Sequence, residues 1–221
     1  LNATTIDGYN PYKVTSEGID WEVINPDDPW SNIGYWGDHQ IIYLLKLLEL
    51  SKAHDPKALH RMAGKNIFAF ANVPYRLKTY EEIVKDPKNS IVFDTDLHAT
   101  SMRLQSQVGQ DAKLILRDGQ PLLVSFTEKL LIPFLTKMSN FIPDAGIWMN
   151  TLRPEWNDAN NALVGNGASM VTLCYMRRYV RFLHVLHVLH LVLPFGSHGH
   201  IVHALPVLHE VPGDLDVNRR D

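Results

Sequence analysis

Residue types suited to acid–base chemistry are concentrated in one short polar segment, residues 153–161. The segment reads Arg153-Pro154-Glu155-Trp156-Asn157-Asp158-Ala159-Asn160-Asn161. A carboxylic acid beside an indole can stay protonated near neutral pH, because loss of hydration disfavours its charged form. Such an acid can donate a proton to a departing oxygen atom. Asp158 is therefore the candidate proton donor, although an Asn/Asp-rich turn that hydrogen-bonds its own backbone would have a similar composition.

A second polar segment, residues 34–40, directly precedes the helix that we expect to be most buried and reads Gly-Tyr-Trp-Gly-Asp-His-Gln. Trp36 offers a flat apolar face that suits a sugar ring. Asp38 offers two acceptors to neighbouring hydroxyl groups, and its charge strengthens the hydrogen bonds that it accepts. His39 follows it and adds a further polar side chain. The alternative is that Asp38 only caps the helix that begins here.

Helices are expected to position these two segments. Residues 40–52 are apolar almost throughout, with their charges on one narrow face, which predicts a helix buried on most sides. Asp55 and Pro56 predict the start of a second helix, whose apolar stripe extends to Ile67. Residues 168–183 form the last predicted helix, directly after the Asp158 segment.

Local signals predict further elements between these helices. Thr79-x-x-Glu82 is a capping box, which predicts a short helix that ends before Pro87. Residues 96–108 are expected to be helical, with Gly109 as the C-terminal stop. These signals depend only on neighbouring residues along the chain.

A β-hairpin and one more helix complete the pattern. An Asp118-Gly119 turn predicts a hairpin within residues 113–124. Ser125-x-x-Glu128 is a second capping box and opens another apolar helix.

Two long loops separate these elements. Residues 1–35 and 141–167 are rich in turn-forming and aromatic residues, and we expect them to be long ordered loops. Helix following helix favours a mainly α architecture with minor β structure.

The composition excludes several classes of protein. The 221 residues carry a formal net charge of −3, from 21 basic and 24 acidic side chains, which argues against nucleic-acid or polybasic membrane binding. The single cysteine, Cys174, excludes an internal disulfide and a cysteine-based zinc site, and we expect it to be a small buried residue. No apolar stretch is long enough for a membrane span. No signal peptide is recognisable, which favours the cytoplasm.

The character of the chain changes over residues 183–221, which are rich in histidine. His184, His187 and His190 recur every three residues among valines and leucines. Three interpretations are open: a metal-binding tract, a helix that tolerates histidines, and a non-native end produced by a shifted reading frame. We favour the last interpretation, because a period of three does not keep side chains on one face of a helix.

The two polar segments together resemble a known enzyme family. Trp156-Asn157-Asp158 with Asn160, followed by Val164-Gly165-x-Gly167 and an apolar helix, resembles the Trp-Asn-Asp-Gly-x-Asn segment of cellobiose phosphorylase-type enzymes, glycoside hydrolase family 94 and its relatives. Asp38-His39 before a long apolar helix resembles their Asp-Asp-His segment. The order and the spacing of 120 residues are also similar. The resemblance covers roughly residues 30–182.

The sequence departs from the family pattern at three positions. Gly37 stands where the family often has an acidic residue, Glu155 replaces an aspartate, and Ala159 replaces a residue that is often glycine. These departures leave the subfamily and the substrate open, but they do not affect the proton donor.

The resemblance implies a fold, a reaction and a set of roles. Residues 1–182 would form about half of an (α/α)6 barrel, a six-hairpin toroid, and would catalyse inverting cleavage of a glycosidic bond by phosphorolysis or hydrolysis. Asp158 would be the general acid. Substrate-binding positions would be Trp36, Asp38, His39, Arg153, Glu155, Trp156 and Asn157.

The implied ligands are an oligosaccharide or β-glucoside, with no metal or cofactor and with inorganic phosphate as a possible co-substrate. In the family, the groups that activate the nucleophile lie beyond the general acid in sequence, where this chain has residues 183–221. We therefore expect this chain alone to be inactive or nearly so. The alternative functions are a non-catalytic sugar-binding module and a helical interaction module.

Overall fold

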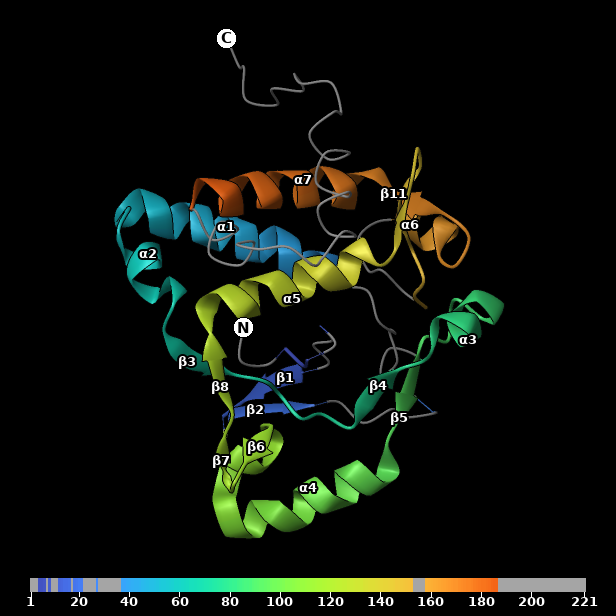
Figure 1. Cartoon of the computed structure of the whole chain (residues 1–221). Helices are drawn as coiled ribbons and strands as arrows, with labels where there is room; N and C mark the ends of the chain where they lie inside the picture. Colours follow the sequence, from blue (N-terminus) through green and yellow to red (C-terminus); the bar gives the residue numbers. More distant parts are fainter. Residues whose placement is uncertain are drawn as a thin grey trace, which may run out of the picture.

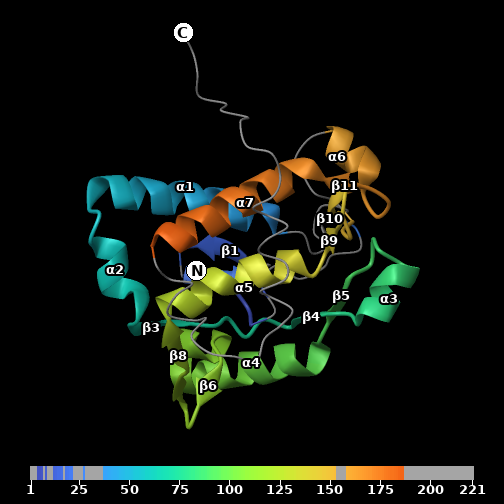
Figure 2. The ribbon, with the colours of Figure 1, turned by 45° about the horizontal axis from the view of Figure 1, so that its top comes forward.

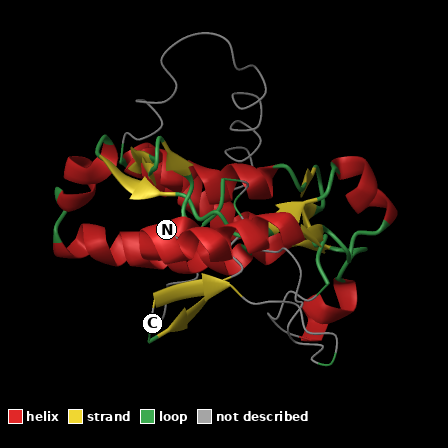
Figure 3. Cartoon of the chain, turned by 90° about the horizontal axis from the view of Figure 1, so that it is seen from below, coloured by secondary structure: helices red, strands yellow, loops and turns green. Residues whose placement is uncertain are grey.

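The protein is mainly helical, with several small antiparallel sheets, as the sequence predicts (Figure 3). The computed structural model describes residues 4–6, 8, 12–16, 18–21, 27, 37–152 and 158–186, although not the side chains of 12–15, 18–21 and 158–160. The predicted positions Trp36, Arg153, Glu155, Trp156 and Asn157 lie outside the described residues, as do residues 187–221. None of the described helices is long and apolar enough to cross a membrane.

Three long helices form the main core: α1 (Asp38–His54), α5 (Phe126–Met138) and α7 (Met170–Val185). α1 and α7 lie side by side in both views (Figures 1 and 2). They run in the same direction, because Arg178 forms an ion pair with Glu49 at 2.6 Å and, further along both helices, Lys52 lies 5.6 Å from the Phe182 ring centroid. α5 runs antiparallel to them and ends where they begin.

The core between these helices is closely packed and apolar. Ile41 and Leu45 of α1, Leu130 of α5, and Met176 of α7 are almost completely inaccessible to solvent. Each such side chain stabilises the fold by about 1.5–3 kcal/mol relative to exposure. Leu183 belongs to the same core, so α7 is continuous across the sequence boundary expected at residue 183.

Tyr179 links two of the core helices through a buried hydrogen bond. Its hydroxyl donates to the Leu130 carbonyl at 2.7 Å. Burial raises the pKa of Tyr179, so the hydroxyl remains a donor. We expect Tyr179→Phe to lower the free energy of unfolding by about 1–2 kcal/mol in urea titrations. Tyr175→Phe on the same helix is the control, because Tyr175 is only partly buried; an equal loss in both variants would contradict the assignment.

A long excursion connects α2 (Ala58–Ala63) to α5 and lies on one side of the helical core (Figure 1). Strand β3 (Asn66–Ala69) leaves α2 and pairs with β8 (Leu123–Ser125), so the chain returns close to where it left. Between them lie β4 (Tyr75–Leu77), α3 (Tyr80–Lys85), β5 (Ile91–Phe93), α4 (Thr95–Val108), the 3-10 helix η1 (Gly109–Lys113), β6 (Leu116–Arg117) and β7 (Gln120–Pro121). This part has its own small apolar cluster around Tyr75 and Ile91.

The locally encoded elements of the excursion agree with the sequence. Both hydrogen bonds of the Thr79–Glu82 capping box are present at the start of α3. Gly109, with φ of 64°, ends α4. Asp118 and Gly119 both have positive φ, as a tight hairpin turn requires. At the start of α5, the Ser125 hydroxyl accepts the Glu128 amide at 3.1 Å, which is one of the two bonds of the second capping box.

Two expectations about the first helices are wrong. The helix predicted after Asp55 ends at Ala63, and Ile67 lies in β3 instead, because the strand pairs with β8. α1 is not buried on most sides: Tyr43, Leu47 and Leu50 are each about 60% exposed or more. Among the described residues, only α2, α5 and α7 pack closely against α1, and they leave this stripe uncovered.

Three further expectations also need correction. Cys174 is exposed rather than buried. The expected loop 1–35 contains the hairpin β1 (Tyr12–Thr15) and β2 (Gly18–Trp21). The expected loop 141–167 contains β9 (Phe141–Ile142), β10 (Gly146–Trp148) and the short helix α6 (Asp158–Leu163), while β11 (Ala168–Ser169) precedes α7.

Candidate functional site

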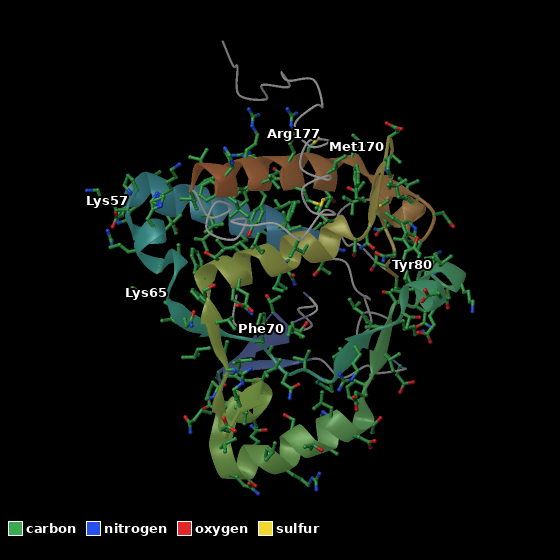
Figure 4. All side chains as sticks on the ribbon, in the orientation of Figure 1. Lys57, Lys65, Phe70, Tyr80, Met170 and Arg177 are labelled. Carbon is green, nitrogen blue, oxygen red and sulfur yellow. The ribbon has the colours of Figure 1, made fainter. Side chains whose placement is uncertain are left out.

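Both polar segments singled out in the sequence lead into the same end of the helical core. α1 and α7 begin at this end and α5 finishes there, next to the three-stranded sheet β9-β10-β11 (Figure 2). Met170, the first residue of α7, marks this end in Figure 4. Residues 34–40 enter α1 here, and residues 153–161 are followed by β11 and α7. The parallel arrangement of α1 and α7 therefore places the described parts of the two segments, residues 37–40 and the start of α6, at one end of the helical core.

Asp38 is the first residue of α1 and is buried, with 2% of its surface exposed. Its Oδ1 atom accepts the His39 amide at 2.7 Å. A carboxylate in the first turn of a helix is stabilised by the partial positive charge of the exposed amide groups. The residue at the N-cap position is Gly37, whose φ of 74° suits glycine, so the interpretation of Asp38 as the N-cap residue is wrong.

Lys137 approaches the same helix end from α5. A Cβ atom added to Gly37 would lie 3.8 Å from the Lys137 Cε atom and 3.5 Å from the Gln40 Oε1 atom. Lys137 is 1% exposed, and burial lowers its pKa to about 7 even though the Asp38 charge acts to raise it. A buried lysine and a buried carboxylate therefore lie near each other at the start of α1.

The second segment is held between fixed ends. The Gly165 amide donates to the Met149 carbonyl at 2.7 Å, and the Met149 amide donates to the Gly167 carbonyl at 2.9 Å. The Trp148 indole also donates to the Gly165 carbonyl at 3.0 Å. A Cβ atom at Gly167 would come within 2.7 Å of Leu163, so this close return requires glycine. The glycines that follow Asp158 thus close a loop whose two ends are hydrogen-bonded together.

A buried pair of asparagines connects the end of α5 to this loop. The Asn150 side-chain amide donates to the Asn140 Oδ1 atom at 3.0 Å. The Asn140 amide donates to the Lys137 carbonyl at 3.0 Å, and its carbonyl accepts the Trp148 amide at 2.8 Å. Both asparagines are buried. The polar contacts thus run from Lys137 through Asn140 to the strand end that enters the second segment.

Asp158 and His39 are the remaining predicted site residues that the structure describes. Asp158 is the first residue of α6, although its side chain is not described, so its separation from Asp38 stays a prediction. His39 is half-buried on α1, with its ring centroid 5.5 Å from that of Tyr43. Among the described residues, no group of three His, Cys, Asp or Glu side chains is arranged to hold a metal ion.

Lys137, Asn140 and Asn150 were not identified from the sequence. A signal for Lys137 exists, because it falls on the apolar face of α5 with Leu130 and Phe134. A lysine at a core position usually has a specific partner. The partner itself, at the start of α1, is not readable from the α5 sequence.

Comparison with known proteins adds no further information about this site. No model of a known protein family matches the chain, and no curated protein is significantly similar to it in sequence.

Proposed function

We propose that this chain is part of a carbohydrate-active enzyme that cleaves a glycosidic bond with inversion, by phosphorolysis or hydrolysis, and that Asp158 is its general acid. The observation that carries this proposal is the parallel pairing of α1 and α7. It places Asp38 and the start of α6, the described parts of the two polar segments, at one end of the helical core, and we propose that a single sugar contacts both.

The proposed fold is part of an (α/α)6 barrel. Such a barrel has two concentric layers, in which neighbouring helices of one layer run parallel and the connecting helix runs antiparallel. α1, α5 and α7 have these relative directions. The exposed stripe of Tyr43, Leu47 and Leu50 lies on a face of α1 where a further helix of the layer would pack. A stripe of large apolar side chains on a helix is usually buried against another part of the protein.

The proposed roles follow from the chemistry of each side chain. Asp158 protonates the leaving oxygen while positive charge develops on the sugar ring. Trp156 excludes water from this acid, and Trp36 stacks on the ring. Asp38 accepts hydrogen bonds from sugar hydroxyls, with His39 beside it. Arg153, Glu155 and Asn157 complete the substrate contacts. Because Asp38 is buried, sugar binding has to displace part of what covers it.

The experiment is a calorimetric titration of the chain with cellobiose, with Asp158→Asn and Asp38→Asn compared with the wild type. Asp38→Asn replaces a charged acceptor, so its affinity should fall about tenfold or more. Asp158→Asn should bind cellobiose almost as the wild type does and lose any turnover that the wild type shows, with or without phosphate. Cellobiose binding that is equal in the wild type and Asp38→Asn would contradict the proposed site.

A second candidate function is a helical interaction module, and the exposed apolar stripe on α1 favours it. Contiguous exposed apolar surface is typical of protein contact sites. This candidate replaces the first if the wild type binds no sugar and sediments as an assembly rather than a monomer.

A further inference from the structure

Two lysines of α5, eight residues apart along the helix, are buried. Lys129 and Lys137 have 0% and 1% of their surface exposed, respectively. Lysine is almost never fully buried unless it has a specific partner. The two lysines have different partners, and these partners indicate the role of each ammonium group.

Lys129 faces the N-terminal segment and the excursion. Its Nζ atom donates to the Thr4 carbonyl at 2.9 Å and lies 4.0 Å from the ring centroid of Phe70. Phe70 lies on the side of α5 away from α7 (Figure 4). These partners are a neutral carbonyl and a ring face, so the contacts of Lys129 are those of a residue that fastens segments of the fold together.

Lys137 faces a carboxylate that belongs to the candidate site. Its Cε atom passes close to Gly37, and the Asp38 charge acts on its ammonium group. Asp38 in turn is fixed by the His39 amide at the first turn of α1. Because its surroundings are packed, this buried carboxylate keeps one orientation.

We propose that Lys137 is a positioning residue of the sugar site, which holds the Asp38 carboxylate in the orientation that accepts hydrogen bonds from sugar hydroxyls. This inference rests on the proposed function. Lys137 itself does not contact the sugar; it acts through Asp38. Through Asn140 and Asn150, the same end of α5 is also connected to the strand that enters the Asp158 segment.

The test compares Lys137→Met with Lys129→Met, which is a matched control because each removes one buried ammonium from α5. At pH 6, where Lys137 is protonated, cellobiose affinity should fall about tenfold or more in Lys137→Met and stay within about twofold of wild type in Lys129→Met. Equal affinity of Lys137→Met and the wild type would overturn the positioning role while leaving the proposed function in place. Failure of the wild type to bind cellobiose would instead contradict the proposed function itself.

A second measurement does not depend on the folding of Lys137→Met. NMR titration of the lysine side chains in Asp38→Asn should show the pKa of Lys137 falling below the wild-type value of about 7, because the nearby negative charge is gone. The pKa of Lys129 should not change, since the charge that acts on it belongs to Glu128. An unchanged pKa of Lys137 in Asp38→Asn would show that the two groups are not coupled and would overturn the inference.

Discussion

The free energy of unfolding should rise steeply between about pH 7 and pH 10. Burial lowers the pKa of both Lys129 and Lys137 from 10.5 to about 7. Between these values the unfolded chain still holds a proton on each lysine that the folded chain has released, so raising the pH favours the folded state. Each pH unit contributes about 1.4 kcal/mol for each lysine, which amounts to roughly 4 kcal/mol for each over this range.

Urea titrations at a series of pH values measure this rise directly. The matched control is Lys129→Met/Lys137→Met, in which the slope should largely disappear. Above about pH 10 the trend should reverse, because burial raises the pKa of Tyr179 and ionisation then favours the unfolded chain. A wild-type free energy of unfolding that stays constant or falls from pH 7 to pH 9 would contradict the burial of the two lysines.

The two lysine-to-methionine variants should change stability in opposite directions at pH 6, where both lysines are charged. Lys129→Met should stabilise the fold by about 1–4 kcal/mol, as is common when an apolar residue replaces a buried ion. In this variant the Thr4 carbonyl still accepts a hydrogen bond from the Ala71 amide at 3.2 Å, so the loss of Lys129 does not leave it without a donor. Lys137→Met should instead destabilise the fold by about 3–5 kcal/mol, because it leaves the Asp38 carboxylate buried without its cation.

The double variant Asp38→Asn/Lys137→Met provides the control for this contrast. It removes both charges, so it should recover most of the stability that Lys137→Met loses. Changes of the same sign and similar size in Lys129→Met and Lys137→Met would mean that Asp38 does not depend on Lys137. Guanidinium would screen charges, so urea is the suitable denaturant.

Elements encoded by neighbouring residues could be predicted from the sequence. The capping box of α3, the Gly109 stop of α4 and the Asp118-Gly119 turn all depend on backbone hydrogen bonds or positive φ angles within a few residues. Because these preferences depend only on neighbouring residues, they can be recognised in the sequence without knowledge of the tertiary packing.

Features that depend on distant partners could not be predicted in this way. The burial of α1 depends on which helices pack against it, so the exposure of Leu47 and Leu50 is not visible in the α1 sequence. Ile67 lies in a strand because β8 pairs with β3, more than 50 residues later in the chain. Pairings of this kind override the helical pattern.

The candidate site likewise contains residues that the sequence indicates and residues whose role only the structure reveals. Residue types identified Asp38 and Asp158, because their chemistry is carried by short segments. Lys137 was missed, although its position on the apolar face of α5 was readable, because its significance comes from the carboxylate that it meets at the start of α1. The direction of α7 relative to α1 also comes only from the structure.

Two-dimensional amide NMR during a cellobiose titration tests whether Asp38 and Asp158 contact the same sugar, as we propose. We expect amide signals around His39 and around Asp158 both to shift, and both sets of shifts to follow one binding curve with a single Kd. Shifts confined to one of the two segments, or two sets that follow different binding curves, would contradict a shared site.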